Sequence, residues 1–386
     1  MKKKVKAAVL EEPEKINIQE FPYPKLDESC ILVKMEMSGI CGTDKHLYKG
    51  ENKFYVGTIR ETTAPYPIIQ GHENYGVVAE LSQKGKKKLD FYGEELKVGD
   101  RVVMGCDVNC GTCYECRHGF GYNAWCRNFK TYGVTISCKN YPHLFGGWAE
   151  YMYITPDVDI YKVPDGLLPE EAVLTELIAN TYALDKAKEF YAMPNEGFAS
   201  MDTVLIQGVG PLGLVSAIKA RILGAGNIIV FDKSEYRIEM CKKFGADYGV
   251  NVDKTSKKER IEIIKDLTKG RGPDVILDCI GIGEVFLEGL ELLRNGGLFI
   301  EQGAHAETGE TVAFSPHRHL LAKSARIIGM NNHPSWGYVP TMELMLKYKN
   351  QFPFSEIVTH KYKIDDAKKA IEKSMDLDTM KVVITP

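Results

Sequence analysis

Four cysteines follow one another closely in the first third of the chain, and they are Cys110, Cys113, Cys116 and Cys126. Zinc prefers four thiolates at the corners of a tetrahedron, and short steps between cysteines let one looping segment supply all four. The alternative is a loop of free or disulfide-linked thiols, which three cysteines at successive three-residue steps disfavour. The pattern predicts a closed zinc site that stabilises this lobe and offers no vacant position for a substrate.

A second set of metal-binding residue types is more widely spaced. Cys41 precedes a short polar segment, and His72 is followed directly by Glu73. One thiolate, one imidazole and one carboxylate can hold zinc while leaving a position open for a substrate or water. Taken singly, a residue such as Cys41 is more often a buried thiol, and one such as His72 is more often a hydrogen-bonded core histidine. The residues alone leave both interpretations open.

A glycine-rich turn lies between two apolar runs farther along the chain. Residues 204–207 form the first run and residues 228–231 the second, which ends at Asp232. The turn between them reads Gly208-Val209-Gly210-Pro211-Leu212-Gly213. Such glycine patterns occur in many tight turns, but a strand before the turn, a helix after it and an acid after the next strand are typical of dinucleotide binding.

Each position of this turn has a physical reason. Gly208 allows the tight turn, Gly210 lets backbone N–H groups approach a pyrophosphate, and Gly213 lets the helix pack close to the sheet. Pro211 and Leu212 begin the helix, whose positive dipole end faces the phosphates. The Asp232 carboxylate is placed to accept hydrogen bonds from the adenosine ribose and would repel a 2′-phosphate. The turn therefore predicts NAD in preference to NADP.

The surrounding elements change character along the chain. Residues 1 to about 175 are rich in short extended runs and turn signals, which predict a mostly β domain. Strands and helices then alternate, with strands expected at 203–207, 228–232, 274–279, 297–301 and 325–329. The remaining predicted elements are helices near 234–244, 283–293, 341–349 and 365–374, a strand at 381–385, and a charged hairpin extension at 84–97.

Composition bounds the class of protein. The chain has 386 residues, 44% of them hydrophobic and 26% charged, with a formal net charge of −3. This length suits two domains, and the charge gives no electrostatic footprint for nucleic acid or an anionic membrane. The first residues are too charged for a signal peptide, and no apolar run approaches the roughly twenty residues of a membrane span. We expect a cytoplasmic protein.

Taken together, these features resemble the zinc-dependent medium-chain alcohol and polyol dehydrogenase family over essentially the whole chain. The segments that carry the resemblance are 39–44, 71–73, the four cysteines, 146–151 and 208–213. The resemblance implies an α/β fold in which a Rossmann domain, a doubly wound parallel sheet, is inserted into a GroES-like β catalytic domain. It assigns 1–177 and 329–386 to the zinc catalytic domain and 178–328 to NAD binding.

The resemblance also implies two zinc ions per chain, one catalytic and one structural. It places Glu176 at the last catalytic-zinc ligand, beside Cys41, His72 and Glu73, as in the sorbitol and threonine dehydrogenase-like branches. Which of the two acids binds zinc directly stays open. From the sequence alone, Glu176 would be an ordinary charge on a helix face.

Further roles follow from the same resemblance. Thr43 is expected to take the proton of the alcohol and to pass it through the nicotinamide ribose toward His46. A helix N-cap is the competing interpretation for Thr43, and a surface histidine for His46. The residues expected to contact NAD outside the turn are Arg237, Ile280, Gly303 and Lys381. A solvated surface charge is the competing interpretation for both basic residues.

The function implied is reversible hydride transfer between NAD and an alcohol, most simply a secondary alcohol or polyol. A primary-alcohol dehydrogenase, a zinc-free reductase of the same superfamily and a non-catalytic zinc-stabilised NAD-binding protein are the alternatives. A homotetramer or homodimer is expected. Residues considered for the substrate pocket are Tyr48, Phe54, Tyr55, Phe145, Trp148, Asn331, Asn332 and His333.

Overall fold

A computed structural model describes residues 4–85, 87–118, 125–188, 197–304 and 307–386 of the chain. The chain divides into two compact units. Unit 1 consists of Met1–Ala179 and His333–Pro386, and unit 2 consists of Asn180–Asn332. Both boundaries lie within a few residues of those that the sequence suggested.

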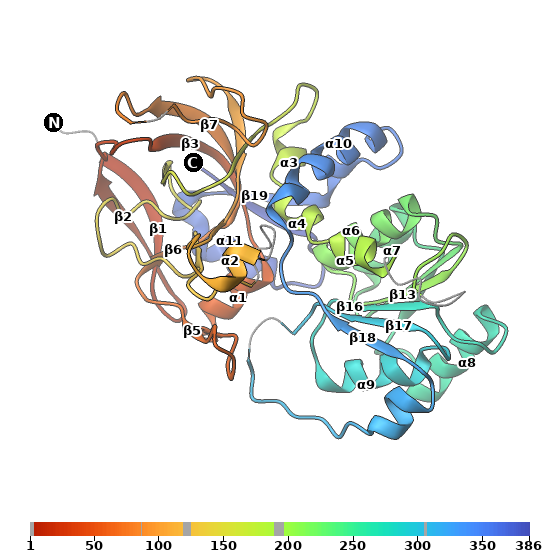
Figure 1. The fold of residues 1–386 in the computed structure, drawn as a ribbon. Helices are drawn as coiled ribbons and strands as arrows, with labels where there is room; N and C mark the ends of the chain where they lie inside the picture. The colour runs from red at the N-terminus through yellow and green to blue at the C-terminus, as the bar shows by residue number, and fades with distance from the viewer. Residues whose placement is uncertain (1–3, 86, 119–124, 189–196, 305–306) are drawn as a thin grey trace. The chain divides into compact units, whose positions relative to one another are not determined.

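Unit 1 is built on a seven-stranded sheet in the order β12-β8-β7-β3-β20-β19, with β11 also paired to β3 (Figure 1). These strands are β3 (Ile31–Gly39), β7 (Glu73–Leu81), β8 (Arg101–Met104), β11 (Tyr151–Ile154), β12 (Ile160–Lys162), β19 (Val358–Lys363) and β20 (Lys381–Thr385). The last strand of the chain pairs antiparallel with β3, so that Ile384 lies opposite Ser38. The two ends of the chain therefore build one unit.

Further strands complete unit 1. A three-stranded sheet has the order β2-β1-β6, and two strand pairs, β4 with β5 and β9 with β10, lie apart from it. Their bounds are β1 (Lys4–Glu12), β2 (Lys15–Pro22), β4 (Lys53–Phe54), β5 (Thr62–Thr63), β6 (Ile68–Ile69), β9 (Asp107–Val108) and β10 (Lys130–Thr131).

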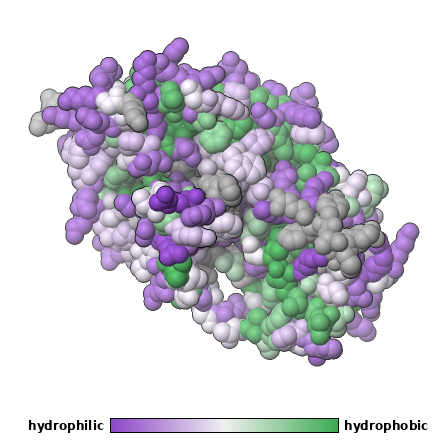
Figure 2. All heavy atoms as spheres, viewed as in Figure 1, coloured by the Kyte–Doolittle hydropathy of each residue, from purple (hydrophilic) through white to green (hydrophobic). Residues whose placement is uncertain are grey.

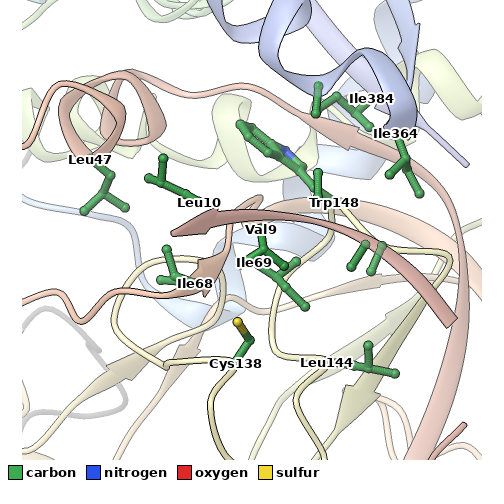
Figure 3. Packing of buried hydrophobic residues seen from close by; sticks show 14 of the residues in the cluster. Val9, Leu10, Leu47, Ile68, Ile69, Cys138, Leu144, Trp148, Ile364 and Ile384 are labelled. Carbon is green, nitrogen blue, oxygen red and sulfur yellow. The ribbon is translucent and has the colours of Figure 1, made fainter. Parts of the chain in front are cut away.

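The main core of unit 1 gathers side chains from distant parts of the sequence. Figure 3 shows Trp148 among Val9 and Leu10 of β1 and Ile384 of β20. The helices of this unit are α1 (Gly42–Tyr48), α2 (Tyr114–His118), α3 (Pro169–Ala172), α4 (Thr175–Ala179), α10 (Tyr338–Tyr348) and α11 (Ala367–Ser374). Ala367, Ala370 and Ile371 are fully buried, because their three- and four-residue spacing puts them on one face of α11.

Unit 2 has a six-stranded parallel sheet in the order β15-β14-β13-β16-β17-β18. The strands are β13 (Thr203–Gln207), β14 (Asn227–Asp232), β15 (Tyr248–Asn251), β16 (Val275–Asp278), β17 (Leu298–Glu301) and β18 (Arg326–Gly329). Every residue of β13 and β16 is buried, as expected for strands covered on both faces.

Helices cover both faces of this sheet (Figure 1). The helices of unit 2 are α5 (Tyr182–Ala187), α6 (Pro211–Ile222), α7 (Glu235–Lys243), α8 (Lys257–Leu267) and α9 (Gly283–Leu292). One face packs against α5, α6 and α7, and the other against α8 and α9. The strand order and the two helical layers make this a doubly wound Rossmann fold, as predicted.

The charged segment 84–97 contains a short antiparallel hairpin, as predicted, but part of the segment is buried instead of solvated. Apart from residue 86, which is not described, it forms a single isolated bridge between Leu89 and Glu95. Leu96 is buried in the core, and the Lys88 ammonium donates to the carbonyls of Pro156 and Val158. The segment therefore folds back onto unit 1 instead of projecting as two regular strands.

Polar residues dominate the face of the molecule in Figure 2, and hydrophobic residues reach the surface in both units. Exposed apolar side chains of unit 2 include Ile282 and Leu321. None of the helices in the described ranges is both long and apolar enough to span a bilayer.

Candidate metal centres and cofactor site

Cys41 lies where β3 gives way to helix α1. It is the N-cap residue of α1, and its backbone N–H donates to the Asp44 carboxylate at 2.8 Å. Strand β3 is held between β7 and β20, so the Cys41 thiol is positioned by the centre of the sheet.

His72 lies one residue before β7 and is buried. A Cβ on Gly71 would lie 2.5 Å from Ser38 Oγ, so the close approach of the chain just before His72 requires a glycine there. The imidazole Nδ1 lies 3.8 Å from Asp44 Oδ1. Burial lowers the pKa of His72, but the negative charges of Asp44, Cys41 and Glu176 outweigh it and raise the pKa well above its usual value. The negative charges that favour a protonated His72 would also attract a divalent cation to this position.

The donor atoms of Cys41, His72 and Glu73 lie within 4.8 Å of one another. A half-buried thiol that converges in this way with a buried imidazole and a buried carboxylate fits a zinc ion. Asp44 is fully buried behind His72, in the position of the carboxylates that orient metal-binding histidines. This role of Asp44 was not predicted, because only its spacing from Cys41 distinguishes it in the sequence.

Lys381 is not placed as the resemblance implied. It is 1% exposed, and its ammonium donates to both carboxylate oxygens of Glu73 at 2.6 and 2.7 Å and to the Ile40 carbonyl at 3.1 Å. Burial lowers the pKa of Lys381, but Glu73 outweighs it, so the net pKa is raised. Lys381 is therefore not a surface lysine. It is also not available for the predicted contact with a pyrophosphate, because its buried ammonium is hydrogen-bonded to Glu73 and Ile40 of unit 1.

Glu176 lies in α4 and belongs to a different donor group. Its carboxylate and the Nε2 atom of His333 are 3.4 Å apart, and the Cys106 thiol completes a group whose donor atoms lie within 4.8 Å of one another. Helix α4 packs against β7, which carries Glu73. No role was predicted for Cys106 from the sequence, and His333 was predicted only as a residue of the substrate pocket.

Thr43 and His46 lie on helix α1. Thr43 is the second helical residue and is buried, so the N-cap interpretation is wrong, since Cys41 occupies that position. His46 is one helical turn farther, with a side chain 33% exposed, and its Nδ1 makes a short contact with the Glu51 carboxylate. The pair thus runs from the buried to the exposed side of α1.

The four cysteines of the lobe lie together, with their sulfur atoms within 4.8 Å of one another. Cys113 Sγ lies 3.3 Å and Cys110 Sγ 3.9 Å from Cys116 Sγ, and no disulfide joins them. Four thiolates around zinc are about 3.8 Å apart when each zinc–sulfur bond is about 2.3 Å. The arrangement fits a four-thiolate zinc site.

Backbone amides support thiolate formation in this lobe. The Cys110 N–H donates to Cys126 Sγ at 3.3 Å, and the Cys116 N–H donates to Cys113 Sγ at 3.4 Å. Hydrogen bonds from the Thr112 and Cys113 backbones lower the pKa of Cys110 to about 5. Part of the interval between Cys116 and Cys126, residues 119–124, lies outside the described residues.

The glycine turn of unit 2 has the geometry that its sequence predicts. Gly208 has a φ of +85°, and a Cβ on Gly213 would lie 2.0 Å from the Gly208 carbonyl oxygen. Gly210 is the N-cap residue of α6, and Pro211 and Leu212 form its first turn. No backbone atom lies within 4 Å of a Cβ built on Gly210, so this position is open to a ligand.

Asp232 ends β14 and contacts this turn directly. Its carboxylate accepts from the N–H groups of Val209 and Ser234, both at 2.8 Å. The Arg237 guanidinium lies 3.9 Å from the Cβ position of Gly210. The acid, the basic residue and the glycine turn are therefore adjacent within unit 2.

Ile280 and Gly303 lie on neighbouring loops at the carboxyl ends of β16 and β17. Asp278 accepts from the N–H of Ile280 at 2.8 Å, and Glu301 accepts from the N–H of Gly303 at 2.9 Å. Burial and the neighbouring Glu301 raise the pKa of Asp278 to about 7. Asp278, which is buried, and Glu301, which is half-buried, fix the two loops.

The aromatic residues considered as pocket walls are mostly core residues. Tyr48, Phe54 and Trp148 belong to the main core of unit 1, and Phe145 packs against it. Tyr55 packs on Phe129 and under the Arg60 guanidinium. Their size and burial are explained by packing alone.

Comparison with known proteins agrees with both units. Residues 27–165 match the alcohol dehydrogenase GroES-like domain, and residues 211–344 match the zinc-binding dehydrogenase model. An L-threonine 3-dehydrogenase of Shewanella putrefaciens is 30% identical over 368 residues, covering 94% of each chain.

Solved structures share the fold over the full length. An alcohol dehydrogenase from Thermotoga maritima superimposes with a TM-score of 0.87 at 33% identity and covers all of both chains. A 2R,3R-butanediol dehydrogenase from Bacillus subtilis covers 99% of each chain with a TM-score of 0.77 at 22% identity, which supports the fold alone. The chain therefore belongs to the zinc-dependent medium-chain dehydrogenase family, as an NAD(P)-linked alcohol or polyol oxidoreductase.

Proposed function

We propose that this enzyme oxidises a secondary alcohol or polyol with NAD at the Cys41–His72 cluster, and catalyses the reverse reduction. The observation that carries the proposal is the convergence of Cys41, His72 and Glu73 donor atoms within 4.8 Å, with His72 and Glu73 buried and Cys41 half-buried. The name of one similar protein, L-threonine 3-dehydrogenase, describes a substrate oxidised at a secondary hydroxyl. This supports the same substrate class here.

Cys41, His72 and Glu176 are proposed to hold the catalytic zinc. Glu73 is less suited to direct binding, because both of its oxygens already accept from Lys381. When bound, the zinc supplies Lewis-acid stabilisation of negative charge on the alcohol oxygen. A second zinc is assigned to the four-cysteine lobe, where its role is structural.

Thr43 and His46 are proposed to carry the alcohol proton outward. Thr43 is buried and lies two residues after Cys41, so its Oγ1 is the group that accepts the proton in a water-poor site. His46 lies one turn farther on α1, partly exposed and beside Glu51, where its imidazole can exchange a proton with water. The nicotinamide ribose supplies the link between them in the relay that the family resemblance implies.

NAD is proposed as the preferred coenzyme, held by the glycine turn with Asp232 on the adenosine ribose. The Asp232 carboxylate accepts hydrogen bonds from two backbone N–H groups, which fix it at the end of β14. Its negative charge would repel a 2′-phosphate. Arg237, Ile280 and Gly303 are the further contacts proposed. Lys381 is left out because it is buried against Glu73.

A panel of alcohols tests the activity. The zinc-loaded enzyme is offered secondary alcohols, polyols, hydroxy amino acids and primary alcohols with NAD, and NADH absorbance is followed. Turnover of secondary hydroxyls supports the proposal. Turnover restricted to primary alcohols supports the alternative, and no turnover with any substrate or with the corresponding carbonyls contradicts both.

The coenzyme preference has its own test. Asp232→Gly is expected to lower the ratio of kcat/KM with NAD to that with NADP by about tenfold or more, because one charge interaction with a 2′-phosphate is worth about 1.4 kcal/mol or more at short range. Glu235→Gln, an exposed acid three residues away, is the matched control. An unchanged ratio in Asp232→Gly would show that the acid does not select the coenzyme.

We further propose a cytoplasmic homodimer or homotetramer. All ten cysteines of the chain are free thiols in the structure, which suits a reducing compartment. The family resemblance supports the oligomer. Sedimentation equilibrium of the zinc-loaded enzyme measures the number of chains, and a monomer at micromolar concentration would contradict it.

A further inference from the structure

Three metal-binding side chains that lie far apart in the sequence meet inside unit 1. Cys106 follows β8, Glu176 lies on α4, and His333 follows the point where the chain returns to unit 1. All three are buried, and their donor atoms lie within 4.8 Å of one another. A thiol, a carboxylate and an imidazole form a donor set suited to zinc and cobalt.

The orientation of His333 suits a metal ligand. Its Nδ1 faces the Pro334 carbonyl at 3.2 Å, which favours a proton on Nδ1 and leaves Nε2 as a ligand atom. Nε2 lies 3.4 Å from Glu176 Oε1. Two ligands of a tetrahedral ion with bonds near 2.1 Å are about 3.4 Å apart, so these two atoms already have the required separation.

Aromatic rings line the other side of this group. The Tyr338 ring packs on His333 with centroids 4.9 Å apart, and Tyr161 packs on Tyr338 at 4.8 Å. Both tyrosines are at most 1% exposed. The site is therefore screened from water, which strengthens the attraction between a cation and its anionic ligands.

This group is distinct from the Cys41–His72–Glu73 cluster. The two donor groups do not merge into one set within 4.8 Å, so a single ion cannot bind all of them at once. Glu176 is close enough to both that its charge acts on His72 as well as on His333. Its two carboxylate oxygens can serve one ion each.

We propose that Cys106, Glu176 and His333 bind a second divalent cation of the zinc class beside the catalytic one, with Glu176 shared between the two ions. Binding replaces the thiol proton of Cys106, which is released to solvent, by a metal–sulfur bond. The competing explanation is a metal-free hydrogen-bonded pair of His333 and Glu176. This inference does not require Cys41, so it can fail while the proposed function stands.

The test counts metal ions on the full chain. The protein is stripped with a chelator, dialysed against Zn²⁺ alone or Co²⁺ alone, and analysed for metal per chain. Wild type is expected to hold one ion more than Cys106→Ala and one more than His333→Gln. The Co²⁺ form of Cys106→Ala is also expected to lose one cysteine-to-cobalt charge-transfer component. Cys138→Ala, a buried cysteine outside every donor group, is the matched control and should equal wild type.

A double variant separates the two ions. Cys41→Ser should lose one ion, and Cys41→Ser combined with Cys106→Ala should lose another. If Cys106→Ala and His333→Gln retain the wild-type metal content, the group binds no metal and the proposal is overturned. It is overturned equally if adding Cys106→Ala to Cys41→Ser removes no further ion, since both residues would then serve the same cation. Circular dichroism confirms that each variant is folded, and His333→Gln decides the matter should Cys106→Ala fail to fold.

Discussion

The four-cysteine lobe and the Cys41–His72 cluster are both suited to zinc, but they are built in different ways. The lobe takes all its ligands from residues 110–126, leaves three of the four cysteines partly exposed, and uses backbone N–H groups to support its thiolates. The cluster takes its ligands from β3, the start of β7 and, as proposed, α4, and its charges are balanced by other buried side chains. The lobe is a local device, whereas the cluster depends on the whole unit.

This difference separates stability from chemistry. A closed four-thiolate site can affect catalysis only through the shape of the lobe, while the cluster can change turnover without changing the fold. The buried charges around the cluster add a second distinction, because Lys381 and Asp44 are needed whether or not metal is bound. The following changes test each side of the comparison.

The largest effect is expected from Cys41→Ser. Loss of a catalytic-metal ligand removes several kcal/mol of transition-state stabilisation, so turnover should fall about a thousandfold or more. One zinc per chain should be lost, while the thermal midpoint of the metal-stripped protein changes little. Steady-state kinetics and metal analysis measure both, and an active variant with full zinc content would remove Cys41 from the site.

Lys381→Met is expected to destabilise the fold strongly. It leaves the Glu73 carboxylate buried without its cation, which costs about 3–5 kcal/mol in comparable buried ion pairs. The double variant Glu73→Gln with Lys381→Met should recover most of this loss, because no uncompensated charge remains. Urea unfolding measures the three free energies. A single variant as stable as wild type would show that the ion pair is not needed in the fold.

Cys113→Ser should act on stability and assembly. Loss of a structural metal is expected to cost more than about 2 kcal/mol, and the zinc of the lobe should be missing. Turnover per remaining catalytic zinc should stay within about threefold of wild type, since a closed site offers no position to the substrate. A thousandfold loss of turnover with unchanged stability would reverse the roles of the two centres.

The smallest effect is expected from the buried acid Asp278, whose main neighbour is the acid Glu301, whereas Glu73 is paired with Lys381. The pKa of Asp278 is raised from 3.8 to about 7 in the folded chain, so between about pH 4 and pH 7 the folded state holds a proton that the unfolded state has lost. The stability that this proton provides is fully present below pH 4 and is lost as the pH rises through 7. Asp278→Asn should match the stability of wild type near pH 4 and be more stable than wild type at pH 8. Equal free energies of unfolding at pH 8 would contradict this.

Features that depend on residues close together in the sequence could be predicted. The cysteine spacing, the glycine turn and the strands β13, β14, β16, β17 and β18 depend on neighbouring residues, and all of them appear in the structure close to the predicted positions. Helix α8 and strand β15 were not predicted, because α8 buries only Ile264 and β15 only Val250. Both patterns are too weak to separate from a loop.

Long-range pairs could not be predicted in the same way. Lys381 and Glu73 are 308 residues apart and meet only because β20 returns beside β3, which in turn pairs with β7. Cys106 and His333 likewise acquire a partner in Glu176 through the fold, and neither lies in a pattern with a recognisable spacing. The family resemblance supplied Glu176, but it misplaced Lys381 because it compares positions without their contacts.

The central claim is that a metal ion bound by Cys41 and His72 acts on the substrate oxygen. The most direct measurement is an anomalous difference map at the zinc absorption edge from crystals of the zinc-loaded enzyme. The account predicts a peak bounded by the Cys41 sulfur, the His72 imidazole and an acidic oxygen, in addition to a peak within the four-cysteine lobe. A peak in the lobe with none at Cys41 and His72, in crystals of enzyme that turns over alcohol, would contradict it.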